Sequence, residues 1–161
     1  MRKIGIIAVL SLMALALAAV PALAQSGHFL DRTVECTDIG TQVQCTGKVA
    51  GLGGTTFEIS VAAAEAIASV ECTNPGGNVA PGQDTAVDVE GTSGLLPTPR
   101  NGNFTFEQTT DDPEPLPPTP TCPNDSWTPN IVDVTFTDAT VTLLEDGAIS
   151  DTITVAVNPE S

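Results

Sequence analysis

Four cysteines carry the most specific chemistry in this sequence of 161 residues: Cys36, Cys45, Cys72 and Cys122. Thiols can form disulfides, coordinate zinc or act as nucleophiles. No two of these cysteines are spaced as C-x-x-C, and the single histidine, His28, lies near the start of the expected mature chain. Because the N-terminus carries an export signal (below), the even number of cysteines predicts two disulfides rather than a zinc site or a catalytic thiol.

Three connectivities are possible for these cysteines, and strand geometry ranks them. If residues 40–41 lie at the centre of a first hairpin, Cys36 falls directly opposite Cys45, within disulfide reach. Cys72 then pairs with Cys122 by elimination. This second bridge would tie together two loops rich in Pro, Asn and Gly.

The second predicted bridge defines a candidate binding end, where residues 73–83 meet residues 123–127. The amides of the first loop should hydrogen-bond loop backbone, and the tryptophan of the second should pack against the first loop. A stapled turn without a ligand is the interpretation that the sequence favours. If the end binds a partner, the candidate binding residues are Asn74, Asn78, Gln83, Asn124, Asp125 and Trp127.

Catalytic chemistry finds little support in the sequence. A serine or cysteine hydrolase needs a base beside its nucleophile, and one histidine without a G-x-S-x-G motif does not provide this. Glycoside hydrolysis by two carboxylates stays open, because acidic residues are plentiful. Sugar-stacking aromatics are scarce, however, with no tyrosine and one tryptophan. We therefore predict that the protein is not an enzyme and has no catalytic residues.

Calcium is the best cofactor candidate, because carboxylate and carbonyl oxygens are its preferred ligands. No EF-hand spacing is present. We expect the acidic pairs Asp111-Asp112 and Glu145-Asp146 to be solvated, and we predict neither a bound metal nor any other cofactor.

The N-terminus indicates export. Residues 1–24 contain a basic start, an apolar run and the small-residue site Ala22-Leu23-Ala24, which are the three parts of a cleavable signal peptide. After its removal, twenty acidic residues face only Arg32, Lys48 and Arg100. Such a charge disfavours binding to nucleic acid, and no later run is apolar enough to insert into a membrane. We expect a secreted, extracellular protein.

The mature sequence, residues 25–161, has the pattern of one all-β domain. Thr and Val are frequent, and apolar residues alternate with polar ones between turn residues, as in Phe57 to Val61, Val87 to Glu90 and Phe104 to Glu107. Several short strands of this kind predict an immunoglobulin-like antiparallel β-sandwich of two sheets.

Two segments need separate treatment. Residues 62–69 are rich in alanine and could form a short helix, but their β neighbours favour a strand. Residues 111–121 contain five prolines, which exclude a helix and a central strand. We expect an extended polyproline-like surface loop there, either a stiff connection or a ligand with a P-x-x-P motif.

Turn residues predict further detail. Asn101-Gly102 predicts a type I′ hairpin that ends in the strand of Phe104. Residues 145–147 should form a three-residue loop that places Leu143 opposite Ile149. The apolar positions change parity near residues 137–138, which predicts a bulge or bend of the kind that moves a strand between sheets.

Five segments in order give the sequence a resemblance: CTGKVAGLG (45–53), CTNPGGNVAPGQ (72–83), NGNFTF (101–106), CPNDSW (122–127) and DVTFTDATVTL (133–143). With these motifs the chain resembles a largely uncharacterised group of short secreted bacterial proteins. The resemblance implies a small exported β-rich domain, favours a strand for residues 62–72, and transfers no catalytic residue.

Together these features predict a secreted, non-enzymatic structural or interaction module of the bacterial cell exterior. Its partner would be an unidentified protein or a component of the cell envelope. The alternative is a β-sandwich domain that binds calcium or carbohydrate, and a small hydrolase with paired carboxylates is the third possibility.

Overall fold

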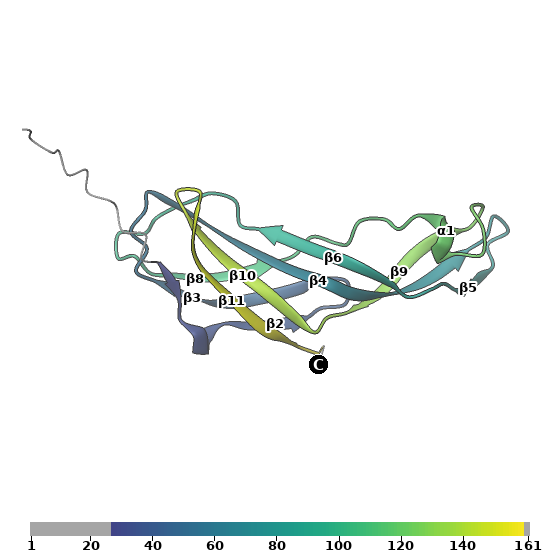
Figure 1. Ribbon diagram of the computed structural model, residues 1–161, viewed down its shortest axis with the longest axis horizontal. Coiled ribbons are helices and arrows are strands. Elements are labelled where there is room, and N and C mark those ends of the chain that lie inside the picture. Colours follow the sequence, from purple (N-terminus) through teal and green to yellow (C-terminus); the bar gives the residue numbers. More distant parts are fainter. Residues whose placement is uncertain (1–26, 160–161) are drawn as a thin grey trace, which may run out of the picture.

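The computed structural model describes residues 27–159, so the predicted signal peptide lies outside the described residues. The described chain is almost entirely β and elongated (Figure 1). Besides a 3-10 turn, η1 (Asp31–Thr33), and a helical turn, α1 (Pro118–Thr121), its elements are β1 (His28–Phe29), β2 (Glu35–Asp38), β3 (Val43–Ala50), β4 (Thr56–Thr73), β5 (Val79–Pro81), β6 (Thr85–Thr92), β7 (Leu96–Pro97), β8 (Phe104–Thr109), β9 (Thr128–Thr135), β10 (Asp138–Glu145) and β11 (Ala148–Asn158).

The first sheet is built around β3. Strand β8 pairs antiparallel with one edge of β3, and β1 and β2 share the other edge. The hairpin of β2 and β3 has the predicted register, with Cys36 directly opposite Cys45. Its turn contains Gly40 at a φ of +99° and is closed by a hydrogen bond from the Ile39 N–H to the Gln42 carbonyl (3.0 Å).

The second sheet is built around β4, an 18-residue strand. Strands β9 and β10 follow one another along one edge of β4, and β5, β6 and β7 lie along the other. Strand β11 pairs with β10 and widens this sheet. Every one of these pairings is antiparallel.

Strand β11 also joins the two sheets. Its last residues, Val157 and Asn158, pair in parallel with Cys36 and Thr37 of β2. The two sheets form the predicted β-sandwich. The pairing of β11 with β2 is parallel, which departs from the antiparallel expectation.

The core lies between the sheets, where alternate residues face inward. Phe57, Ile59 and Val61 of β4 are buried, as their alternation with polar residues predicts. The ring of Phe57 also meets Phe104 of the first sheet edge to face, with centroids 4.9 Å apart. The large inward side chains of both sheets therefore contact each other directly.

Residues 62–69 belong to β4, which confirms the strand prediction. A bulge interrupts the pairing of β4 with β6 between Ala63 and Ala66. Within it, Glu65 adopts a φ of +56° and its N–H donates to the Asp88 carboxylate (2.9 Å). The buried positions change parity at this bulge, so both halves of the strand keep an apolar face on the core.

The bend predicted at residues 137–138 lies between β9 and β10. Both strands pair with β4, β10 with residues 57–62 and β9 with residues 67–73. The bend is therefore present beside the β4 bulge, but it does not carry the chain into the other sheet.

The predicted hairpin at Asn101-Gly102 is wrong. Strand β7 precedes this turn and pairs with β4, whereas β8 follows it and pairs with β3. The Gly102 N–H donates to the Pro99 carbonyl (2.9 Å), and Gly102 has a positive φ while Asn101 does not. Because a type I′ turn needs a positive φ at both residues, this turn instead passes the chain from one sheet to the other.

The last hairpin also differs from its prediction. Its loop has two residues, Asp146 and Gly147, with φ of +48° and +83°, as in a type I′ turn. Ser150 is then an extra residue in β11, so that Leu143 pairs with Asp151. This bulge restores the pairing of odd with odd positions, which a two-residue loop alone would break.

Residues 111–121, here called the strap, are mostly extended, and Pro117 has the polyproline-like angles φ −68° and ψ 146°. The short α1 departs from the prediction that prolines exclude a helix, although Thr119 within it is extended. The strap is also more than a surface connection, because Leu116 packs against the core and Thr121 is buried. It accompanies the ends of β4 and β9, which extend beyond the first sheet (Figure 1).

Candidate functional site

Two disulfides hold the chain, with the predicted connectivity. Cys36 and Cys45 are bridged across the β2–β3 hairpin, with Cα atoms 4.1 Å apart. Cys72 and Cys122 are bridged with Cα atoms 5.8 Å apart and a sequence separation of 50. Disulfides are typical of oxidising compartments, and an extracellular location is consistent with both bridges.

The second bridge lies at the projecting end of the molecule, beside β5 and α1 (Figure 1). The sulfur of Cys72 and the N–H of Gln83 both approach the Thr121 carbonyl, at 3.7 and 2.9 Å. This end, residues 73–83 and 122–127, is here called the stapled end. A hollow on it is lined by Thr73, Asn74, Pro75, Ser126, Thr128 and Asn130, so the two predicted loops do meet.

The first loop of the stapled end is held by its own polar groups. The Asn74 side-chain oxygen accepts the Asn78 N–H (2.9 Å), as predicted, and the Asn74 carbonyl accepts the Gly77 N–H (2.9 Å). The Asn78 side chain lies 3.4 Å from the Asn74 side chain rather than on loop backbone. Gln83 contacts the strap through its backbone N–H, which donates to the Thr121 carbonyl, whereas the sequence predicts a hydrogen bond from its side chain.

The second loop has the same kind of internal support. The Asn124 side-chain oxygen accepts the N–H and the hydroxyl of Ser126, at 3.0 and 2.6 Å. Asp125 accepts the Thr119 hydroxyl and so connects the loop to the strap. Trp127 is half-buried and packs against the core. Of the candidate residues, Asn78, Gln83, Asn124 and Asp125 remain exposed.

Glu145 is the polar residue that the sequence interpretation missed. Its side chain is fully buried, whereas a solvated one was expected. One carboxylate oxygen accepts the N–H groups of Gly53 (2.7 Å) and Gly54 (3.1 Å). The other accepts the Gly27 N–H (2.9 Å) and lies 2.7 Å from the Ser150 hydroxyl. The available sequence signal was the Glu-Asp-Gly turn together with the glycine-rich segment Gly51-Leu52-Gly53-Gly54, whose composition indicates a turn.

The four donors determine the charge state of Glu145. Burial raises the pKa of this carboxyl group, but the hydrogen bonds from Ser150, Gly53, Gly54 and Gly27 outweigh burial and lower the pKa below its ordinary value. The carboxylate therefore remains charged and serves as an internal anchor between the β10–β11 turn, the N-terminal segment and the loop before β4.

Asp146 extends this anchor at the surface. Its carboxylate accepts the Thr55 N–H (3.0 Å) and the Thr56 N–H (2.9 Å). These backbone hydrogen bonds, that of Thr56 first, lower the pKa of Asp146. The contacts of both acids are structural, since each carboxylate is occupied by donors of the protein itself.

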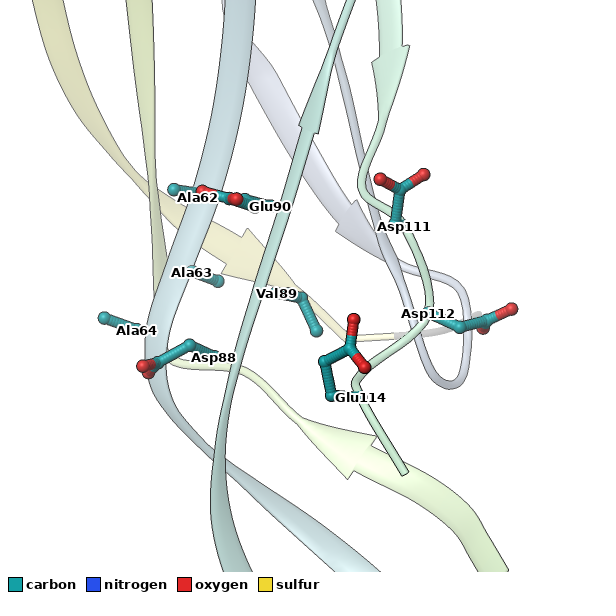
Figure 2. A pocket seen from close by; sticks show the side chains of 9 residues that line it. All are labelled: Ala62, Ala63, Ala64, Asp88, Val89, Glu90, Asp111, Asp112 and Glu114. Carbon is teal, nitrogen blue, oxygen red and sulfur yellow. The ribbon is translucent and has the colours of Figure 1, made fainter. Parts of the chain in front are cut away.

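A second hollow lies between β6 and the first residues of the strap, and Figure 2 shows its lining side chains. This acidic groove has a volume of about 510 Å³. Its floor contains small side chains of β4, and five carboxylates but no basic residue line it. The lining residues are Ala62, Ala63, Ala64, Asp88, Val89, Glu90, Asp111, Asp112 and Glu114.

Residues 27–159 contain neither a cluster of metal ligands nor a membrane-spanning helix. Within residues 27–159, no three His, Cys, Asp or Glu side chains come close enough together to hold a metal ion. No helix in this part of the chain has the length and apolar character needed to cross a bilayer.

Fold and bridges together define an all-β sandwich with a disulfide-stapled projecting end. The sequence matches no protein-family model, and a search among curated proteins found no similar sequence.

Proposed function

We propose that this protein is a secreted, non-enzymatic structural or interaction module of the bacterial cell exterior. Its contact surface is the stapled end, and its partner is a protein or another component of the cell envelope. The observation that carries this proposal is the bridge between Cys72 and Cys122, which fixes two exposed polar loops at the tip of the molecule.

Rigid loops suit recognition, because little conformational entropy is lost when a partner binds them. The internal hydrogen bonds of Asn74 and Asn124 hold each loop, and the bridge holds the loops together. The exposed side chains of Asn78 and Asp125 then present fixed polar groups to a partner.

Photo-crosslinking tests the contact surface. A photoreactive residue replaces Asn78 in the purified mature protein, which is then added to the native cell surface and irradiated. A matched variant carries the same residue in place of Glu35, which is exposed on β2 of the other sheet. We expect a specific cross-linked product from position 78 and none from position 35. Equal products from both positions, or none from either, would contradict the proposal.

Secretion has a separate test. Mass spectrometry of the culture medium should find a chain that begins at Gln25 and carries two disulfides. Retention of the intact chain inside the cells would contradict the proposed location.

A further inference from the structure

Strand β6 has an edge that no strand of the described chain occupies. It pairs with β4 only. In an antiparallel pair, the N–H and C=O groups of alternate residues point away from the partner strand. The Ser93 N–H bonds to Ile59 of β4, whereas the Glu90 carbonyl accepts the Asp111 N–H (2.8 Å) from the other side. The even-numbered residues of β6 therefore direct their backbone groups outward.

The strap leaves this edge open. At its start, the Asp111 N–H donates to the Glu90 carbonyl of β6. At its end, the Thr121 carbonyl accepts the N–H of Gln83, which lies just before β6. Between these points its prolines cross towards β9, where a hollow is lined by both segments. Proline has no N–H, so a strap with five prolines cannot complete the sheet in place of a strand.

The open edge lies on the acidic groove. Asp88 and Glu90 are exposed side chains of β6, and Asp111 and Glu114 of the strap also line the groove (Figure 2). A second copy of this chain would bring further negative charge to the edge, because the protein has a net charge of −15. Like charges on opposed strands are destabilising, and opposite charges are favourable.

We propose that the edge of β6 from Ala86 to Glu90 binds, by strand addition, an extended segment of another protein with lysine or arginine at every second position. The outward backbone groups of Ala86 and Asp88 pair with the segment, whereas the Glu90 carbonyl keeps its bond from the Asp111 N–H. Its cationic side chains lie on the outer face beside the Asp88 and Glu90 carboxylates. This surface is distinct from the stapled end, so the test of strand addition is independent of the test of the function proposed above.

A labelled seven-residue peptide of alternating lysine and threonine tests the proposal by fluorescence anisotropy on the disulfide-intact protein. We expect saturable binding that weakens with salt, and no binding of the matching glutamate–threonine peptide. A lysine–threonine peptide with methylated backbone nitrogens keeps its charge but loses its donors. It should bind about tenfold more weakly, because it cannot donate backbone hydrogen bonds to the edge.

Variants of the protein separate pairing from charge. Ala86→Pro removes an outward N–H that does not serve β4, so the fold is kept and binding should fall about tenfold. Ala86→Val keeps the N–H and is the matched control, which should bind as the unaltered protein does. Glu90→Gln with Glu114→Gln should weaken binding, whereas Glu35→Gln on β2 should not.

Equal binding of the methylated and unmethylated peptides, with Ala86→Pro unchanged, would mean attraction by charge alone and would overturn the proposal. Failure of the lysine–threonine peptide to bind at low salt would also overturn it. Unchanged denaturation midpoints of the variants show that any loss of binding comes from the edge and not from unfolding.

Discussion

Replacing Glu145 by glutamine tests the buried anchor. The substitution keeps the shape of the side chain but changes one oxygen into an NH₂ group. The amide oxygen can still accept from Gly53 and Gly54, and the NH₂ can donate to Ser150. It then faces the N–H of Gly27, where two donors meet at the present distance of 2.9 Å. The charge-assisted bonds are lost as well.

The expected cost follows from these contacts. A hydrogen bond to a charged group contributes about 1.5 to 3 kcal/mol, and one donor is left without an acceptor inside the protein. We expect Glu145→Gln to lower the free energy of unfolding by about 2 kcal/mol near neutral pH. Glu145→Ala should cost more, because it removes the acceptor of the Gly27, Gly53 and Gly54 N–H groups and opens a cavity.

The pH dependence gives a second readout. The pKa of Glu145 is lower in the folded chain than its ordinary value of 4.5, and the same direction holds for Asp146 relative to 3.8. Their contribution to stability is complete above these ordinary values and is lost as the pH falls through the folded ones. The stability difference between the protein and Glu145→Gln should therefore shrink on acidification below about pH 4.5.

Urea denaturation followed by circular dichroism, with the disulfides intact, measures both effects. Glu71→Gln is the matched control, because Glu71 is an exposed glutamate of β4. An unchanged midpoint for Glu145→Gln near neutral pH, or a difference that grows in acid, would refute the assignment of Glu145 as a charged anchor.

Two further changes test the packing of the second sheet. Replacing Cys72 and Cys122 by alanine opens a loop of 50 residues and should lower stability by about 4 kcal/mol, with new protease cleavage at the stapled end; a chain as stable as before would contradict the role of this bridge. Gly91→Ala would place a Cβ 2.4 Å from the Thr109 carbonyl, so we expect a loss of about 2 kcal/mol. Gly76→Ala, where the nearest atom is a side-chain oxygen at 3.3 Å, is the control and should change little in the same urea titration.

The local predictions that succeeded rest on period and turn chemistry. Alternation predicted the buried face of β4, and the position of Gly40 predicted the register that brings Cys36 opposite Cys45. The second bridge then followed, since only two cysteines were left. These inferences depend on the spacing of nearby residues and on the number of cysteines, and both can be taken from one sequence.

The errors arose where a turn was assigned without knowledge of its partner strands. Asn101-Gly102 has the composition of a hairpin, but its flanking strands belong to different sheets. At the last hairpin, the bulge at Ser150 corrects the register within the strand, so the loop length could not be deduced from the register alone. Bulges are favoured by tertiary packing, and the local sequence does not specify them.

The sequence by itself determined the all-β composition, the alternating core positions and the pairing of the cysteines, because these depend on the type and spacing of residues. Only the tertiary structure decided that Glu145 is buried among donors from two distant segments, at Gly27 and at Gly53-Gly54, and from nearby Ser150. It also decided that the strap leaves the edge of β6 open. Contacts between segments far apart in sequence depend on how the sheets stack and where the connections cross, and local periodicity carries no record of either.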